Sequence, residues 1–185
     1  MSIWIRFFWV IIAGYFRKPL DVLGVSVLQQ RVWPDELDTN MHMNNAKYLA
    51  VMDLGRVDWI VRSGAWRLMR HEKMMPVVGG AMVRYRRSLT LFQRYELRTR
   101  LLGWDERWLY IEQIMECKDG GMACLAVQRT TFTRKGKLVP TAELAARLGV
   151  DASAMPAPDW TRSWNESEAA FVKSVEARAL GPVEE

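Results

Sequence analysis

Residues 35–49, DELDTNMHMNNAKYL, concentrate hydrogen-bonding side chains immediately before an apolar stretch. Asp38 is a candidate catalytic residue, because an ionised carboxylate can attack an acyl carbonyl directly or activate a water molecule. A helix that begins near Asn45 would leave its first N–H groups without intrahelical partners, and these groups could polarise the same carbonyl. The segment therefore predicts chemistry at an acyl group, carried by a carboxylate close to a helix N-terminus.

A structural interpretation of the same residues stays open. Asp38, Asn44 and Asn45 are residue types that cap helices and stabilise turns through bonds from side chain to backbone. His42 is a further candidate catalytic residue, although no serine or cysteine stands near it to complete a nucleophilic triad. A single histidine among scattered carboxylates is a poor set of zinc ligands, so no metal is predicted.

A long helix over residues 46–63 is the element that must position this segment. It contains no proline, and its apolar residues recur at helical intervals: Tyr48, Leu49, Met52, Trp59 and Ile60. Gly64 is suited to the C′ position that ends a helix. Gly55 in the middle costs roughly 1 kcal/mol relative to alanine, and the close approach of a strand would explain it.

The rest of the chain predicts one antiparallel sheet. We expect a strand over residues 22–33 and alternating strands within 76–89, 95–102, 107–117 and 122–134. Short and final helices are expected after residue 140, the last one beginning at Ser163–Glu166, which resembles a capping box. The expected organisation is a hydrophobic segment (1–20), a central domain (22–149), and a linker with a C-terminal helix (150–185).

The overall charge is mildly basic, at +5 with a pI near 9.4. This balance suits a phosphate-bearing ligand or an anionic membrane surface, and the absence of a lysine-rich block disfavours nucleic acid as a partner. Cys117 and Cys124 match neither a zinc spacing nor a disulfide framework. We therefore expect reduced core thiols and a cytoplasmic protein, with a position peripheral to the membrane as an open alternative.

The most apolar stretch lies at the N-terminus, where residues 7–16 carry no charge. A membrane-spanning helix needs about twenty apolar residues, and Arg6 interrupts this one. Two interpretations remain. Residues 3–18 contact a membrane interface, with their tryptophans at headgroup depth and Arg6, Arg17 and Lys18 on lipid phosphates. Alternatively, they form a helix that packs on the protein.

The segment 35–49 resembles hot-dog-fold thioesterases of the 4-hydroxybenzoyl-CoA thioesterase type, and its amino-acid sequence is closest to that of the THEM6-like branch. The pattern of these enzymes is roughly Asp-x-Asp-x-x-Gly-His-Val-Asn-Asn-x-x-Tyr, followed by an acidic residue and arginine. The chain reads Glu36-Leu37-Asp38-Thr39-Asn40-Met41-His42-Met43-Asn44-Asn45-Ala46-Lys47-Tyr48, then Asp53 and Arg56. The resemblance covers about residues 22–149 and includes the order of elements. It implies an α+β fold, a single hot-dog domain whose long central helix is wrapped by an antiparallel β-sheet. The hydrophobic N-terminal helix and the C-terminal helical tail would lie outside that domain.

The resemblance also implies a function, the hydrolysis of an acyl-CoA or acyl-carrier-protein thioester to free acid and thiol. Coenzyme A would enter as part of the substrate, and no other cofactor is implied. By the same resemblance Asp38 is the catalytic carboxylate and the Asn45 backbone N–H polarises the thioester carbonyl. His42, Asn44 and Tyr48 would shape the loop and the pocket. A homodimer or homotetramer with sites at the subunit interface is expected.

Two positions depart from the pattern: Glu36 replaces the first aspartate, and Met41 replaces a glycine, the residue that adopts positive φ most easily. Asp53 is a second candidate carboxylate, since a helix-borne acid is catalytic in another branch of the fold; a salt bridge to Arg56 is the alternative. Contacts to coenzyme A phosphates are expected from basic residues that could equally be solvated: Arg84, Arg86, Arg87 and Arg94. The alternative function is a non-catalytic acyl-binding or lipid-binding protein, or a membrane-associated scaffold, of the same fold.

Overall fold

The computed structural model describes residues 2–179; residues 1 and 180–185, at the outer ends of the expected terminal segments, lie outside the described residues. The helices of this part of the chain are α1 (Ile3–Phe16), α2 (Asn45–Arg62), α3 (Ala65–His71), α4 (Thr141–Arg147) and α5 (Trp160–Ala179), with short 3-10 helices at Pro34–Glu36 and Ala152–Ala154. The strands are β1 (Ser26–Arg31), β2 (Met74–Tyr85), β3 (Arg94–Trp104), β4 (Leu109–Cys117), β5 (Met122–Arg134) and β6 (Lys137–Val139). The stretch between the predicted long helix and the strand expected within residues 76–89 contains a helix, α3, that was not predicted from the sequence.

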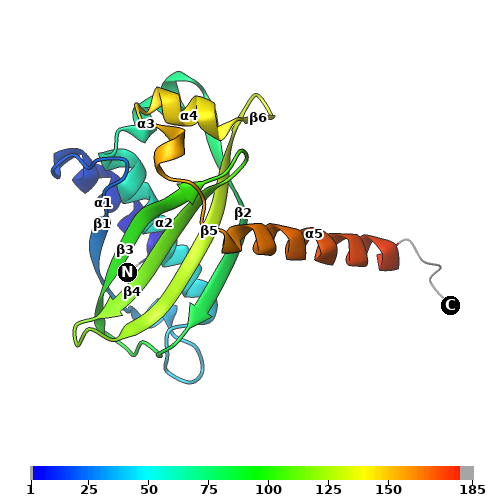
Figure 1. Cartoon of the computed structure of the whole chain (residues 1–185). Coiled ribbons are helices and arrows are strands. Elements are labelled where there is room, and N and C mark those ends of the chain that lie inside the picture. The colour runs from blue at the N-terminus through cyan, green and yellow to red at the C-terminus, as the bar shows by residue number, and fades with distance from the viewer. Residues whose placement is uncertain (1, 180–185) are drawn as a thin grey trace.

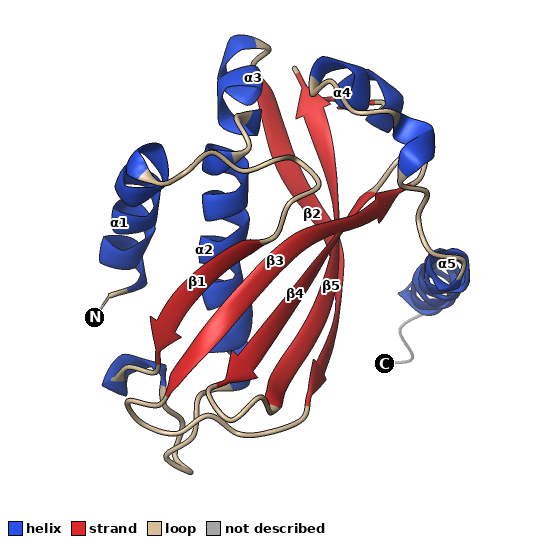
Figure 2. Cartoon of the chain, turned by 60° about the vertical axis from the view of Figure 1, so that its left-hand side comes forward, coloured by secondary structure: helices blue, strands red, loops and turns tan. Residues whose placement is uncertain are grey.

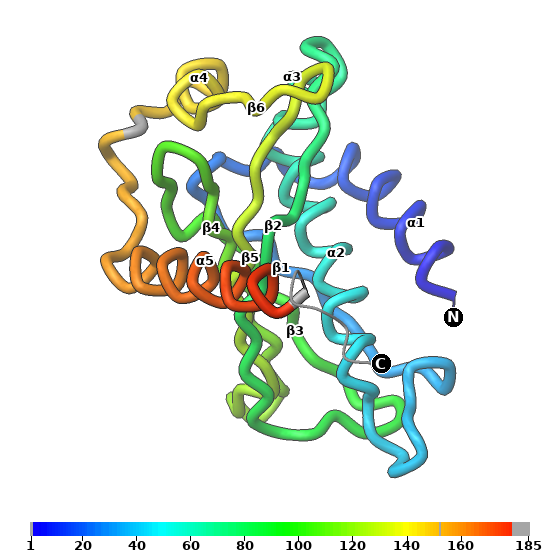
Figure 3. The backbone as a smooth tube through the Cα atoms, turned by 90° about the vertical axis from the view of Figure 1, so that its right-hand side faces the viewer, coloured from blue at the N-terminus to red at the C-terminus, as the bar shows by residue number. Residues whose placement is uncertain are grey.

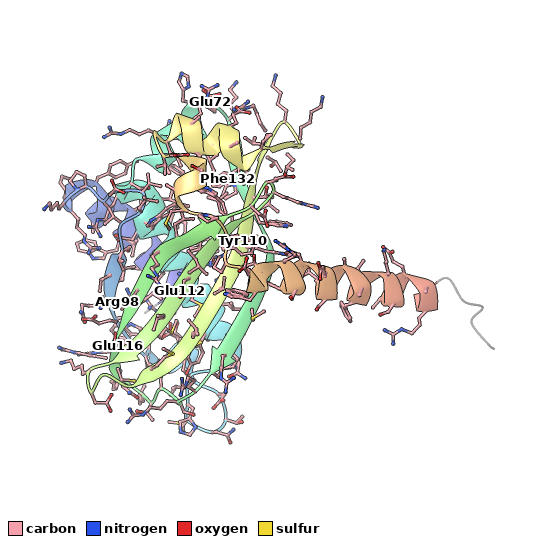
Figure 4. All side chains as sticks on the ribbon, in the orientation of Figure 1. Glu72, Arg98, Tyr110, Glu112, Glu116 and Phe132 are labelled. Carbon is pink, nitrogen blue, oxygen red and sulfur yellow. The ribbon has the colours of Figure 1, made fainter. Side chains whose placement is uncertain are left out.

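The strands form one antiparallel sheet in the order β1-β3-β4-β5-β2, and β6 pairs with the end of β5. Figures 1 and 2 show the sheet curling around α2, which lies along its concave face. Outward-facing positions of β3 and β4 carry charged side chains, including Arg98, Glu112 and Glu116 (Figure 4). A long helix wrapped by an antiparallel sheet is the predicted α+β architecture, and this prediction is confirmed.

Glycine at position 55 allows α2 to lie against the sheet. A Cβ atom there would be 2.9 Å from Gln113 Nε2 and closer still to Thr99 Oγ1, so the neighbouring strands would have to move. The inner side of α2 is buried at Tyr48, Val51, Met52, Leu54 and Trp59. The helix ends before Gly64, whose φ of +79° fits its predicted position at the C-terminus. The close strand approach expected at Gly55 is thus confirmed.

The N-terminal helix α1 packs beside α2 (Figures 2 and 3). Its buried residues are Arg6, Val10 and Gly14, and a Cβ atom on Gly14 would lie only 2.9 Å from Val61 Cγ1. Large apolar side chains on the other side of α1 are exposed: Trp4, Ile5, Phe8, Trp9, Ile12, Tyr15 and Phe16. No helix in residues 2–179 is both long and apolar enough to cross a membrane.

The C-terminal helix α5 projects away from the sheet (Figure 1) and contacts the body through its first half, as far as Glu168, which forms an ion pair with Arg129 of β5. There Asn165 Nδ2 donates to the Tyr110 hydroxyl (2.8 Å), and Tyr110 lies at the base of α5 in Figure 4. The predicted start at Ser163 is wrong, because α5 begins at Trp160. Thr161 is buried, and both its N–H and its hydroxyl donate to the Pro158 carbonyl, so tertiary burial initiates the helix one turn earlier.

Candidate active site

Asp38 lies in a tight turn that its own carboxylate stabilises. The Asp38 N–H donates to the His42 carbonyl (2.8 Å), and the Met41 N–H donates to the Asp38 carbonyl (3.1 Å). Asp38 Oδ1 accepts the N–H groups of Asn40 (2.9 Å) and His42 (3.2 Å). The turn therefore fixes the carboxylate through Oδ1, which leaves Oδ2 without a hydrogen-bond partner among residues 2–179.

The loop around this turn is held in place on both sides. Leu37 and Met43 form an antiparallel bridge with each other, and His42 forms another with Thr90. The Met43 N–H also donates to the Leu89 carbonyl (2.8 Å) in the segment that follows β2. Met43 and Leu89 are both buried, so the loop has an apolar anchor beneath its polar surface.

The N-terminus of α2 begins directly after this loop. Asn44 is the N-cap, and its side chain accepts the Ala46 N–H (2.9 Å), so the capping interpretation is confirmed for this residue. Asn45 is the first helical residue, and its N–H has no acceptor within the helix. The helix dipole adds a partial positive charge at this point. The cap and the candidate oxyanion donor are therefore consecutive residues of one element.

Two tyrosines close the other side of the site. The rings of Tyr48 and Tyr85 meet edge to face with their centroids 5.1 Å apart. The Tyr85 hydroxyl donates to the Asn45 carbonyl (3.1 Å), which ties β2 to the first turn of α2. Burial raises the pKa of Tyr48 to about 12, so this phenol stays protonated at neutral pH. Both rings thus support the helix N-terminus without adding charge.

These groups line one pocket of about 320 Å³ at the N-terminal end of α2. Its lining residues are Asp38, Asn40, His42, Met43, Asn45, Tyr48, Tyr85, Arg86, Arg87 and Ser88. The structure therefore brings together most of the residues predicted for the site, namely Asp38, His42, Asn45, Tyr48, Arg86 and Arg87. An Arg87 guanidinium N–H also donates to Asp119 (2.6 Å) at the exposed rim. A carboxylate, free helix N–H groups and two arginines suit a thioester that carries phosphates.

Three predicted residues lie elsewhere. Asp53, further along α2, forms the expected ion pair with Arg56 and lines a separate, largely apolar cavity of about 500 Å³. Burial lowers the pKa of Arg56 to about 10. Arg84 is exposed on β2 and does not line the Asp38 pocket, and Arg94 of β3 lies in a different pocket beside Trp9 of α1.

Comparison with known proteins establishes the family. The model of the thioesterase-like superfamily matches residues 32–165. The chain belongs to the thioesterase-like superfamily. Among relatives, it is 41% identical over 118 residues to Protein THEM6 of Danio rerio, covering 63% of the chain and 58% of that protein. It is 29% identical over 115 residues to Thioesterase lcsJ of Purpureocillium lilacinum, covering 52% of the chain and 37% of that protein. The chain thus spans little more than half the length of the first of these superfamily relatives.

Solved structures share the fold. The probable thioesterase YbaW of Escherichia coli superposes with a TM-score of 0.63 at 22% identity, over 66% of the chain and 96% of that protein. The hypothetical protein SAV2348 of Staphylococcus aureus, solved in complex with CoA, superposes with a TM-score of 0.61 at 13% identity, over 74% of the chain and 89% of that protein. The fold is therefore the hot-dog fold of the superfamily.

Met41, which stands where the resembled pattern has glycine, keeps a backbone conformation that glycine adopts. It adopts a φ of +60°, the left-handed conformation that glycine takes most easily. Its side chain is 60% exposed, so the methionine meets no packing constraint. The position does require positive φ, and methionine satisfies this requirement at a local conformational cost.

Sequence reasoning missed Tyr85 and misassigned Arg6. The alternation of residues 76–89 places Tyr85 on the same side of its strand as Val83, which packs on the core, and this was the available signal. Arg6, which one of the two interpretations of residues 3–18 placed on lipid phosphates, is instead buried in an ion pair with Glu36. Arg17 likewise pairs with buried Asp58 (2.8 Å). No local pattern indicates either pair, because the partners are 30 and 41 residues apart.

Proposed function

We propose that this protein is a thioesterase that hydrolyses acyl-CoA or acyl-carrier-protein thioesters to free acid and thiol. The observation that carries the proposal is a turn-held carboxylate, Asp38, in the same pocket as the N-terminus of α2. The thioester carbonyl oxygen would accept the Asn45 N–H, which stabilises the negative charge that develops on that oxygen.

Asp38 could hydrolyse the thioester by either of two mechanisms in this arrangement. As a general base it takes a proton from water through Oδ2, the hydroxide adds to the carbonyl carbon, and the C–S bond breaks to give acid and thiol. As a nucleophile it forms an acyl–Asp38 anhydride and releases the thiolate, and water then hydrolyses the anhydride. Both routes require an ionised Asp38, and the turn holds this carboxylate with two backbone N–H groups.

The proposed substrate has a phosphate-bearing end and an apolar end. Arg86 and Arg87 line the pocket and are suited to pyrophosphate or phosphopantetheine oxygens. The apolar cavity that Asp53 lines begins at Ala50, about 7.5 Å further along α2 from Asn45, because five residues rise 1.5 Å each. An acyl chain that follows α2 from Asn45 would reach it, which favours a long or aromatic acyl group.

We further propose a homodimer formed through β2, with a homotetramer as a larger assembly of the same unit. β2 has 12 residues and pairs with β5 on one side, and it is an edge strand of the described sheet. It exposes apolar side chains at Met75, Val77, Val78 and Met82. An exposed apolar edge strand of this length is a ready template for pairing with a second copy.

The test of the activity is thiol release from a panel of acyl-CoAs that differ in chain length and in aromatic character. Turnover with a clear optimum supports a thioesterase. Tight binding of acyl-CoA without turnover anywhere in the panel would instead support the alternative, a non-catalytic acyl-binding protein of the same fold. Because Cys117 and Cys124 are buried, the protein's own thiols contribute little background to a thiol assay of the folded enzyme.

A peripheral membrane contact through α1 is the second property that we propose. Trp4 and Phe8, at 69% and 62% exposure, belong to the exposed apolar row on α1. Cations at Arg31, Arg94 and Lys118 line a pocket together with Trp9 of the same helix. Aromatic side chains beside basic ones suit the interface of an anionic bilayer.

Sedimentation with phosphatidylcholine vesicles that contain phosphatidylglycerol tests this contact. The double variant Trp4→Ser, Phe8→Ser should bind at least about tenfold more weakly, because each ring contributes roughly 1.5–3 kcal/mol when buried. The matched control is Phe171→Ser, Val172→Ser on the exposed part of α5. Equal binding of both variants and wild type would exclude α1 as the docking surface.

A further inference from the structure

The buried side of α1 reaches the loop that carries Asp38. Arg6 is 3% exposed, and its guanidinium forms an ion pair with Glu36 and donates to Gln30 Oε1 (2.6 Å). The Glu36 side chain is equally buried. Two charges removed from water in this way depend on one another, since either alone would be unpaired in an apolar environment.

Glu36 in turn holds both ends of the loop. Its Oε2 atom accepts the Trp33 N–H (2.9 Å) where the loop begins. Its backbone carbonyl accepts the N–H of Asn44 (2.8 Å), the N-cap of α2 where the loop ends. Asp38 lies between these two attachments. The longer side chain of glutamate, in place of the aspartate of the superfamily pattern, is the group that reaches Arg6.

We propose that Arg6 is a positioning residue of the active site, which acts through Glu36 to set Asp38 against the N-terminus of α2. This inference rests on the proposed function. It makes α1 a structural part of the catalytic site as well as a surface element. Arg6 does not line the Asp38 pocket, so its effect is on geometry and not on substrate binding.

Arg17 supplies a matched control within the same helix region. Like Arg6, it ties the N-terminal segment to a buried carboxylate, Asp58, whose side chain is 1% exposed. Asp58 lies 13 residues after Asn45, so this pair is about 20 Å along α2 from the pocket. Arg6→Met and Arg17→Met each remove a guanidinium from a buried carboxylate, but Asp58 keeps Arg62 (3.0 Å) and Ser26 as partners, and only Arg6→Met acts on the Asp38 loop.

The experiment compares kcat and KM of the full chain with the acyl-CoA of the panel that the wild type hydrolyses best, at a temperature where both variants are folded. Arg6→Met should lower kcat by about 10- to 100-fold, the scale of a misplacement of about 1 Å, with KM within about threefold. Arg17→Met should keep kcat within about twofold. Equal losses in the two variants would overturn the proposal.

A double variant separates positioning from stability. Arg6→Met with Glu36→Gln removes the unpaired buried charge, so its thermal midpoint should return towards that of wild type while kcat stays low. Recovery of kcat together with the thermal midpoint would show that Arg6 acts through stability alone and would overturn the proposal. Arg6→Lys should recover part of kcat, because lysine restores the positive charge opposite Glu36 but has one nitrogen in place of the two that reach Glu36 and Gln30.

A readout without substrate keeps this inference separate from the proposed function. Hydrogen exchange of the Asn40 and His42 amides reports the turn, because both donate to Asp38 Oδ1. These amides should exchange faster in Arg6→Met than in Arg17→Met. Absence of turnover in wild type would refute the thioesterase proposal alone, whereas unchanged amide exchange in Arg6→Met would refute the positioning proposal.

Discussion

Replacing Asp38 by asparagine removes the charge of the candidate catalytic group and keeps its shape. The amide oxygen of the new side chain can still accept the N–H groups of Asn40 and His42, so the turn is retained. A hydrogen bond to a charged group contributes roughly 1.5–3 kcal/mol and a neutral one roughly 0.5–1.5 kcal/mol. The difference of about 1–1.5 kcal/mol for each of the two bonds amounts to about 2–3 kcal/mol of unfolding free energy, and because Asp38 is only half-buried we expect a loss of about 1–2 kcal/mol.

The catalytic loss should be much larger than the loss of stability. A positioned general base contributes about 10²- to 10⁴-fold, which corresponds to about 2.7–5.4 kcal/mol at 1.36 kcal/mol for each factor of ten. We expect kcat for thiol release from acyl-CoA to fall by this factor in Asp38→Asn. KM should change little if the charge acts mainly in the transition state.

Two control variants separate the loss of catalysis in Asp38→Asn from a loss of stability. Asp38→Ala removes the acceptor of both turn N–H groups, so it should lose activity and also more stability than Asp38→Asn. Asp35→Asn neutralises an exposed carboxylate of the same segment that does not line the pocket, and it should retain activity. A folded Asp38→Asn enzyme with more than about a third of the wild-type kcat would refute the reasoning and shift attention to Asp53, since that loss is below the range expected for a general base.

Three further outcomes test the fold and the site. Gly55→Ala should lower the free energy of unfolding in urea by about 1–3 kcal/mol, because its Cβ would overlap Thr99, and a stabilised variant would contradict this packing. Met41→Gly should raise that free energy by at most about 1 kcal/mol and leave kcat unchanged. Glycine removes the conformational strain of methionine at positive φ, but it also makes the unfolded chain more flexible, which offsets part of the gain. A lower kcat would show that the Met41 side chain takes part in catalysis. Burial raises the pKa of Tyr48 to about 12, from 10.0 in an unfolded chain. The contribution of the buried Tyr48 phenol to stability is therefore complete below pH 10.0 and should be lost as the pH rises from 10.0 to about 12. Alkaline unfolding should accordingly be weaker in Tyr48→Phe, and an identical pH profile would contradict the assignment.

Local patterns determined the elements and the central site. The helical spacing of apolar residues predicted α2, and the polar segment before it indicated a helix start near Asn45, with Asp38, Asn44 and Asn45 as candidate capping residues. Alternation predicted the antiparallel strands, and Gly55 indicated the close approach of the sheet. These features are readable because helix periodicity, capping and strand alternation each depend on residues within a few positions of one another.

Tertiary structure decided which distant side chains meet. Arg6 and Glu36 carry no mutual signal in the sequence, yet folding buries them as a pair, since α1 packs beside α2 and reaches the loop. The same packing placed Arg94 next to α1 and away from the Asp38 pocket. The earlier start of α5 also came from burial of Thr161. Such pairings depend on how complete elements pack, because the cost of burying a charge is met only by a partner that the whole fold supplies.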